Sequence, residues 1–364
     1  MRPHVLLSAR SRKAAVPLAV VAVAAAFSPR VSAATAPAHR PVSSTASAVH
    51  RVLFDDSKAE TAGNSDWIIS TSKPDPLQEN PAPRTETDWT GAISSWGVAL
   101  QKTGQYSLDT VPPGGTITYG NTGNALDLSY FDAFVLPEPN VRLSSAEKAA
   151  VMRFVQNGGG LFLVSDHTGS DRNNDGWDSP KIINDLMTAN GVNNNDPFGF
   201  SVDSLNKTTD DPVAIHDSSN PIINGPFGTV SGSILRNGTT MTLHPADNPN
   251  VRGLVWLSTA NPAGTTGAFV VTSTFGKGRV AVWGDSSAID DGTGEPGKKL
   301  YRGWDDPQGT NAAIGLNTTA WLATAGAVGE PATVARGLST TRAQVGRRAL
   351  QGGDVGGLRS STPR

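Results

Sequence analysis

Acidic side chains follow several short apolar runs of this chain, and these are the residues whose types and spacing could do chemistry. They are Asp55, Asp56, Glu138, Asp166, His167 and Asp285. If the runs are parallel strands, five carboxylates and one imidazole meet at one edge of a sheet. Carboxylates held together repel one another unless a proton or a cation lies between them. The pattern therefore predicts a binding or catalytic site at this edge.

Oxygen ligands of this kind suit Ca²⁺, Mg²⁺ or Mn²⁺. We expect Asp55, Asp56, Asp166 and Asp285 to hold such a metal, which would acidify a water molecule and polarise a phosphoryl or carbonyl oxygen. Asp166 and His167 are the expected catalytic residues, with Glu138 as a general base. The alternative is structural, since acids at strand ends also cap helices and brace loops.

A second acidic pattern directly follows His167. Asp171, Asn173 and Asp175, with Gly176 behind them, match the first half of a calcium loop, in which alternate side chains turn inward. The acid expected at the twelfth position is missing, because Ile182 stands there. The pattern predicts a calcium site, with a surface loop of Asx turns as the alternative.

Serine chemistry is a further alternative. The sequence Gly284–Ser287 is similar to the GDS block of GDSL-type esterases. Those enzymes carry the block on their first strand and a D-x-x-H near the C-terminus. Here the block comes late and no D-x-x-H follows it, so the serine reading ranks below the metal site.

The elements that must position these residues follow from periodicity and from start and stop signals. The apolar runs 51–54, 106–111, 133–136 and 161–164 predict strands, and 268–273 with 279–283 predict a hairpin. Apolar spacing predicts helices at 87–102, 144–157, 180–190 and 311–322. Ser144 and Glu147 form a capping box at the start of the second helix, and three glycines end it.

This order of elements predicts an α/β fold. Strands that alternate with helices indicate a mostly parallel sheet with helices on both faces. Wholly apolar strands such as 161–164 are typical of a sheet covered on both sides. The late hairpin adds antiparallel strands. We therefore expect a flavodoxin-like layered fold.

Composition limits the possible classes of protein. The chain has 364 residues and no cysteine, which excludes disulfides, thiolate metal sites and a cysteine nucleophile. Its net charge of −2 is uneven, because residues 34–330 hold 19 basic and 31 acidic residues, a net charge of −12. Such an acidic domain attracts divalent cations and carries no strong nucleic-acid signature.

The ends of the chain differ from its middle. Residues 1–33 have a basic start, an apolar stretch and small residues at the expected cleavage site, which is the pattern of a cleavable signal peptide. Residues 34–49 resemble a linker and 327–364 a disordered basic tail, which leaves 50–326 as the folded domain. We expect a secreted, extracellular protein with no membrane span after signal cleavage, acting on an unknown extracellular substrate or ligand.

Several motifs, taken in order, resemble the class I glutamine amidotransferase-like superfamily and its ThuA-like and gliding-motility-type branches. They are the glycine run and strand 158–164, the Asn-Pro-Ile turn 220–222, the strand 276–286 and the helix ending at Trp321 and Leu322. The resemblance covers about residues 50–325 and implies a flavodoxin-like fold. It does not imply amidotransferase activity, because Ser165–Gly169 stands where the family's enzymes carry their cysteine turn.

Two functions are compatible with these observations. The first is a secreted, metal-dependent hydrolase of unknown substrate, with phosphoesters, nucleic acids or glycans all open. The second is a non-catalytic extracellular domain, stabilised by calcium, that binds a glycan or a protein. Turnover that depends on metal would distinguish the first from the second.

Overall fold

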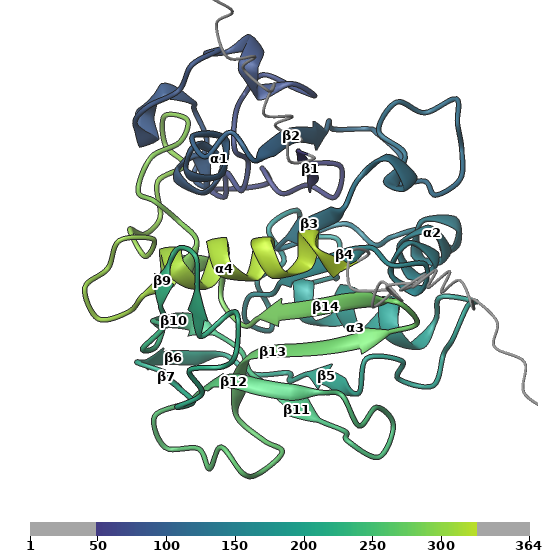
Figure 1. Cartoon of the computed structure of the whole chain (residues 1–364), viewed down its shortest axis with the longest axis vertical. Helices are drawn as coiled ribbons and strands as arrows, with labels where there is room; N and C mark the ends of the chain where they lie inside the picture. Colours follow the sequence, from purple (N-terminus) through teal and green to yellow (C-terminus); the bar gives the residue numbers. More distant parts are fainter. Residues whose placement is uncertain (1–48, 326–364) are drawn as a thin grey trace, which may run out of the picture. The chain divides into compact units, whose positions relative to one another are not determined.

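The computed structural model describes residues 49–325 of the chain (Figure 1). The predicted signal peptide (1–33) and basic tail (327–364) lie outside these residues, as does the predicted linker (34–49) apart from Val49. Within residues 49–325, no helix is both long enough and apolar enough to cross a bilayer.

A ten-stranded sheet forms the centre of the fold. Strands β2, β1, β3, β4 and β14 run parallel in that spatial order, and the antiparallel strands β13, β11, β5, β12 and β7 follow. These strands span His50–Asp55 (β1), Tyr106–Val111 (β2), Ala133–Pro137 (β3), Gly160–Val164 (β4), Phe200–Val202 (β5), Val213–Ala214 (β7), Met241–Leu243 (β11), Arg252–Trp256 (β12), Ala268–Phe275 (β13) and Gly278–Trp283 (β14).

Two small sheets accompany the large one. They pair Lys207–Asp210 (β6) with Leu235–Gly238 (β10), and Asn224–Gly225 (β8) with Gly228–Thr229 (β9). The helices are Ser94–Gln101 (α1), Ser145–Gln156 (α2), Ser179–Thr188 (α3) and Asn311–Ala323 (α4). Ser144 caps α2 through the predicted capping box with Glu147, an arrangement worth about 1 kcal/mol.

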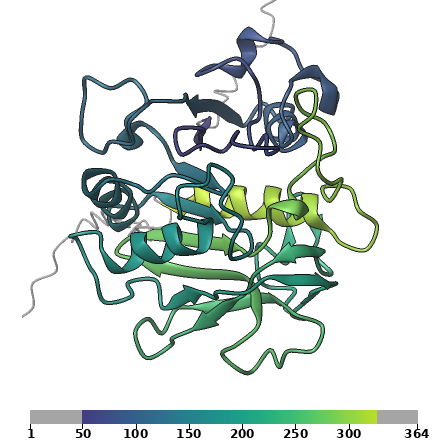
Figure 2. The same ribbon diagram turned by 180° about the vertical axis from the view of Figure 1, so that it is seen from behind.

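Helices cover both faces of the parallel strands, as Figures 1 and 2 show from opposite sides. Val52 and Phe54 of β1 lie in a core with α1 and α4, whereas Leu53 lies in a second core with α2 and α3. Alternate side chains of a strand point to opposite faces, so a strand covered twice has to be apolar throughout. The predicted flavodoxin-like layered α/β fold is confirmed.

One helix begins later than its periodicity predicts. The predicted helix 87–102 is a short 3-10 turn at Glu86–Asp88, followed by α1 from Ser94. Between them, the backbone N–H groups of Ala92 and Ile93 donate to the carbonyls of Asp66 and Ile68. Because these amides are bonded to a neighbouring segment, they cannot begin a helix, and the apolar spacing of 89–93 serves packing instead.

Candidate active site at the carboxyl ends of the strands

The parallel register brings the predicted residues of three neighbouring strands to one edge. Pro137 pairs with Val164, and Val164 pairs with Trp283. Each of these residues ends its strand, so Glu138, Ser165 and Gly284 start the loops of the same edge. The predicted Glu138, Asp166 and Asp285 are 0%, 3% and 0% exposed, and buried carboxylates require partners.

Arg172 is the main partner of Glu138 and Asp166. Its Nε donates to Glu138 Oε1 at 2.5 Å, and its Nη2 donates to Asp166 Oδ2 at 3.0 Å. The Ser170 hydroxyl lies 2.8 Å from Glu138 Oε1 and 2.7 Å from Asp166 Oδ2. One guanidinium and one hydroxyl therefore link two carboxylates, at a position where the sequence predicted a metal ion.

Protons stay on this cluster to unusually high pH. Burial raises the pKa of Asp166 well above its usual range, and the charges of Glu138 and Asp285 raise it further, against the opposing effect of Arg172. Burial also raises the pKa of Asp285 to about 7, although the N–H groups of Arg236 and Ser287 hydrogen-bond its carboxylate. At neutral pH the cluster thus holds exchangeable protons.

The tautomer of His167 follows from its partner. Its Nδ1 lies 2.9 Å from the carbonyl oxygen of Thr168, and a carbonyl only accepts, so Nδ1 carries the proton in the neutral ring. The free lone pair is therefore on Nε2, which lies 4.0 Å from Asp166 Oδ2. The side chain is 23% exposed, so this lone pair is within reach of solvent.

A cavity of about 140 Å³ opens beside these groups. Its walls include Asp166, His167 and Arg172, together with Asn64, Trp67 and Tyr301. Trp67 is 1% exposed, and among residues 49–325 its indole N–H has no hydrogen-bond partner.

Sequence reasoning missed Arg172, Asn64, Trp67 and Tyr301. Arg172 lies inside the predicted calcium loop, and an arginine beside a predicted carboxylate cluster was the available signal. Its Nη1 donates to Asn64 Oδ1 at 2.8 Å, which fixes the guanidinium from a third side. Asn64, Trp67 and Tyr301 come from distant segments and had no signal in the local sequence.

Asp55 and Asp56 form a separate cluster at the same edge. Asp55 and Glu60 are both fully buried, and burial raises the pKa of Asp55 to about 6 and that of Glu60 well above its usual value, with the charge of Asp55 raising the pKa of Glu60 further. Asp56 forms an ion pair with Lys73, whose Nζ lies 2.5 Å from Asp56 Oδ2. These partners are distinct from those of Asp166, so the predicted residues divide into two groups.

The predicted calcium loop satisfies its carboxylates with its own backbone. Asp171 accepts from the N–H groups of Asp175 and Gly176, and Asp175 accepts from Trp177. Asp175 also accepts from the Asn173 amide. These Asx turns match the alternative weighed for the pattern.

The metal ion predicted at the strand edge stays a prediction. The oxygens of Glu138, Asp166 and Asp285 accept from protein donors, and Arg172 occupies the space between two of them. Within residues 49–325, three metal-ligand atoms lie close together elsewhere, at Asp196, His244 and Asp247. None of these three was predicted.

The serine alternative also lacks its base. Ser286 lines the cavity, and Asp285 caps the 3-10 turn Ser286–Ala288. Among residues 49–325, no histidine is hydrogen-bonded to Ser286 or Ser287, and the hydroxyl of Ser287 donates to the carbonyl of Arg236. The serines of this block therefore serve as part of the wall and the turn.

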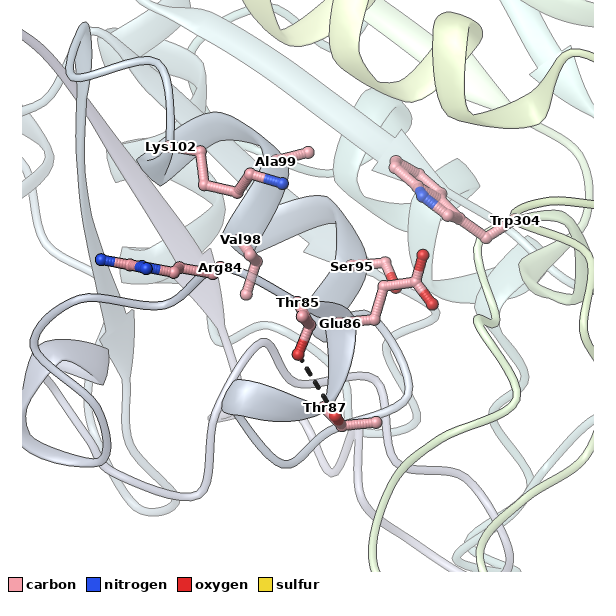
Figure 3. A pocket seen from close by; sticks show the side chains of 9 residues that line it. All are labelled: Arg84, Thr85, Glu86, Thr87, Ser95, Val98, Ala99, Lys102 and Trp304. Atoms are coloured by element: carbon pink, nitrogen blue, oxygen red, sulfur yellow. Dashed lines mark hydrogen bonds between the residues drawn. The ribbon is translucent and has the colours of Figure 1, made fainter.

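A larger cavity of about 440 Å³ lies beside α1 (Figure 3). Its walls are Arg84, Thr85, Glu86, Thr87, Ser95, Val98, Ala99, Lys102 and Trp304. Figure 3 shows Trp304 on one side of it and Arg84 with Lys102 on the other. It contains none of the predicted residues, and the titratable groups on its walls are exposed, so the smaller cavity is the better candidate.

Comparisons with known proteins find remote structural similarities and no function. Similar solved structures include the N-terminal domain of mmIFT52 (12% identity, TM-score 0.45, covering 75% of this chain and 97% of that one). A ThuA-like protein from Parabacteroides merdae is 15% identical, with a TM-score of 0.38, and the match covers 76% of this chain and 90% of that one. A cytoplasmic protein from Salmonella typhimurium is 10% identical, with a TM-score of 0.43, and the match covers 75% of this chain and 99% of that one. No protein-family model and no curated protein matches the sequence. The fold and the site together define a layered α/β protein with a polar cavity at the edge of its sheet.

Proposed function

We propose that this protein is a hydrolase whose active site is the cavity at the ends of β4 and β14. The observation that supports it is the pairing of a basic nitrogen with a retained proton: the free Nε2 of His167 lies 4.0 Å from the high-pKa carboxyl of Asp166. General acid–base catalysis requires such a pair beside a space that holds substrate.

We also propose the amidotransferase-like relationship, supported by the order of its motifs, and an extracellular location, supported by the predicted signal peptide.

Water is the proposed nucleophile. His167 Nε2 takes a proton from water as the water oxygen bonds to the scissile centre, and Asp166 gives its proton to the departing oxygen. The protonated His167 then returns a proton to Asp166, which restores both groups. Arg172 stabilises the negative charge on the oxygens of the transition state. No step in this scheme requires a metal ion.

A phosphoester is the substrate class that these donors favour. A guanidinium that is fixed from three sides suits anionic oxygens. Hydrolysis of a glycan normally uses two carboxyl groups that face each other across the sugar. Here Glu138 and Asp166 are both joined to Arg172 instead.

Hydrolysis of p-nitrophenyl phosphate and bis(p-nitrophenyl) phosphate tests this function. We expect His167→Gln to lower kcat by about 10²–10⁴-fold, the usual contribution of a general base, with the melting temperature nearly unchanged. His216→Gln is the matched control, since His216 is exposed and next to an acid, Asp217. The assay is run with and without EDTA.

Equal rates in wild type and His167→Gln would contradict the proposed mechanism. Absence of turnover on both esters, combined with saturable binding of inorganic phosphate, would favour the non-catalytic binding domain. Loss of activity in EDTA that Mg²⁺ or Ca²⁺ restores would show that hydrolysis depends on the metal ion predicted from the sequence.

A further inference from the structure

Asp196, His244 and Asp247 form a second cluster of reactive side chains, which shares no residue with the proposed active site. One ligand atom from each lies within 4.8 Å of the others. Asp196 lies in the loop before β5, and His244 and Asp247 lie in the turn after β11. Strands β5 and β11 are adjacent in the sheet, so the pairing of these strands brings the three residues together.

The carboxylate of Asp196 is held in place by its own loop. Asp196 has a left-handed backbone, with φ of 46°, and its Oδ1 accepts from the N–H groups of Gly199 and Phe200. Its Oδ2 remains for another partner and lies 2.5 Å from His244 Nδ1. The carboxylate thus presents one free oxygen towards the imidazole.

The other ring nitrogen of His244 also has a partner. Ser201 Oγ lies 3.5 Å from Nε2, so the hydroxyl can accept from an Nε2–H. The carboxylate of Asp196 only accepts, so Nδ1 carries the proton of this short hydrogen bond; a bound metal ion would displace that proton, and the ring would then keep its Nε2–H towards Ser201. Metal-binding histidines commonly use their second nitrogen in this way, and the hydrogen bond fixes the orientation of the ring.

The local charge favours a cation. Asp196 and Asp247 carry two negative charges, and no lysine or arginine among residues 49–325 lies within 4 Å of either carboxylate; the ion-pair partner of Asp196 is His244. The side chains of His244 and Asp196 are 35% and 18% exposed, and Asp247 is exposed. A bound ion would therefore keep open positions for water.

We propose that Asp196 Oδ2, His244 Nδ1 and an oxygen of Asp247 form a site for a divalent transition-metal ion of the zinc class. One nitrogen and two carboxylate oxygens suit Zn²⁺, whereas Ca²⁺ prefers oxygen ligands alone. In a tetrahedral Zn²⁺ site, neighbouring ligand atoms lie roughly 3.3 Å apart. To reach that spacing from 2.5 Å, Asp196 Oδ2 and His244 Nδ1 would move apart by less than about 1 Å. The ion would tie the loop before β5 to the turn after β11.

Calorimetric titration of the full chain, prepared without a histidine tag and treated with EDTA, tests the site. We expect one Zn²⁺ per chain, a higher melting temperature with Zn²⁺, and no comparable effect of Ca²⁺. Asp247→Asn, at an exposed position that should not affect folding, is expected to weaken Zn²⁺ binding by about tenfold or more. His244→Ala should abolish it, and His216→Ala is the matched control.

No stoichiometric binding, or equal affinity in Asp247→Asn and wild type, would overturn the proposal, and weak binding that persists in His244→Ala would indicate an adventitious ion only.

Ser201, His244 and Asp196 also stand in the order of a nucleophile, base and acid. Labelling of Ser201 by a fluorophosphonate in a protein that binds no Zn²⁺ would assign these residues to serine chemistry instead.

Discussion

Two carboxylate clusters lie at the same edge of the sheet and differ in what balances their charge. Glu138 and Asp166 are joined by Arg172, beside a cavity. Asp55 is buried with the high-pKa carboxyl of Glu60, whose pKa its charge raises, and neither lines any cavity described above. Burial raises carboxyl pKa values in both clusters, so a shifted pKa alone does not mark an active site. Access to a ligand distinguishes the two.

The largest effect is expected from removing the cation of the first cluster. Arg172→Met removes the cation that Glu138 and Asp166 share and leaves Glu138 buried without a counter-charge, and breaking a buried pair typically costs about 3–5 kcal/mol of unfolding free energy. Urea denaturation measures this change. Arg302→Met is the control, since Arg302 pairs with Asp305 on the surface, where its side chain is 67% exposed. Equal stability of the two variants would contradict the role given to Arg172.

A smaller effect, a loss of stability as the pH rises, is expected from the buried carboxyl groups whose pKa values are raised. The pKa values of Asp55, Asp285 and Asp290 rise from 3.8 to about 6, 7 and 6 on folding. The folded state then binds more protons than the unfolded state between about pH 4 and 8, so the free energy of unfolding falls as pH rises through this window. Melting temperature measured against pH should show this decline.

Glu60→Gln tests the source of that decline. A glutamine amide donates to Asp55 without needing a proton from solution, and its carbonyl still accepts from the N–H of Lys58, as Glu60 does at 2.7 Å. The variant should gain roughly 1 kcal/mol relative to wild type between pH 5 and 8, since one pKa unit is about 1.4 kcal/mol. Parallel curves for wild type and variant would show that Glu60 is ionised throughout.

The smallest effect is expected in the loop that resembles a calcium site. Because Asp171 and Asp175 accept from their own backbone, we expect Ca²⁺ to shift the melting temperature by no more than about 1 °C, in wild type as in Asp175→Asn. Differential scanning calorimetry with and without Ca²⁺ measures this. A large shift that Asp175→Asn removes would establish the calcium site that the pattern predicts.

Much of the fold could be predicted because its signals are local. The capping box at Ser144, the glycines after α2 and the apolar strand 161–164 each specify their element from neighbouring residues. The elements then specify the edge: Glu138, Asp166 and Asp285 lie at strand ends, as predicted. The predicted helix 87–102 was wrong in its first residues, because the amides of Ala92 and Ile93 bond to a segment that periodicity does not reveal.

The amino-acid sequence by itself determined the layered α/β architecture, the acidic strand ends and the absence of cysteine chemistry. Only the tertiary structure decided which charges meet. Arg172 lies between Glu138 and Asp166 because its loop folds back over the strand ends, and the Asp196–His244 pair exists because β5 and β11 are neighbours. Local periodicity determines where a strand ends. The distance between two side chains from different segments depends on the path of the whole chain, and their electrostatic interaction changes within a few ångströms of that distance.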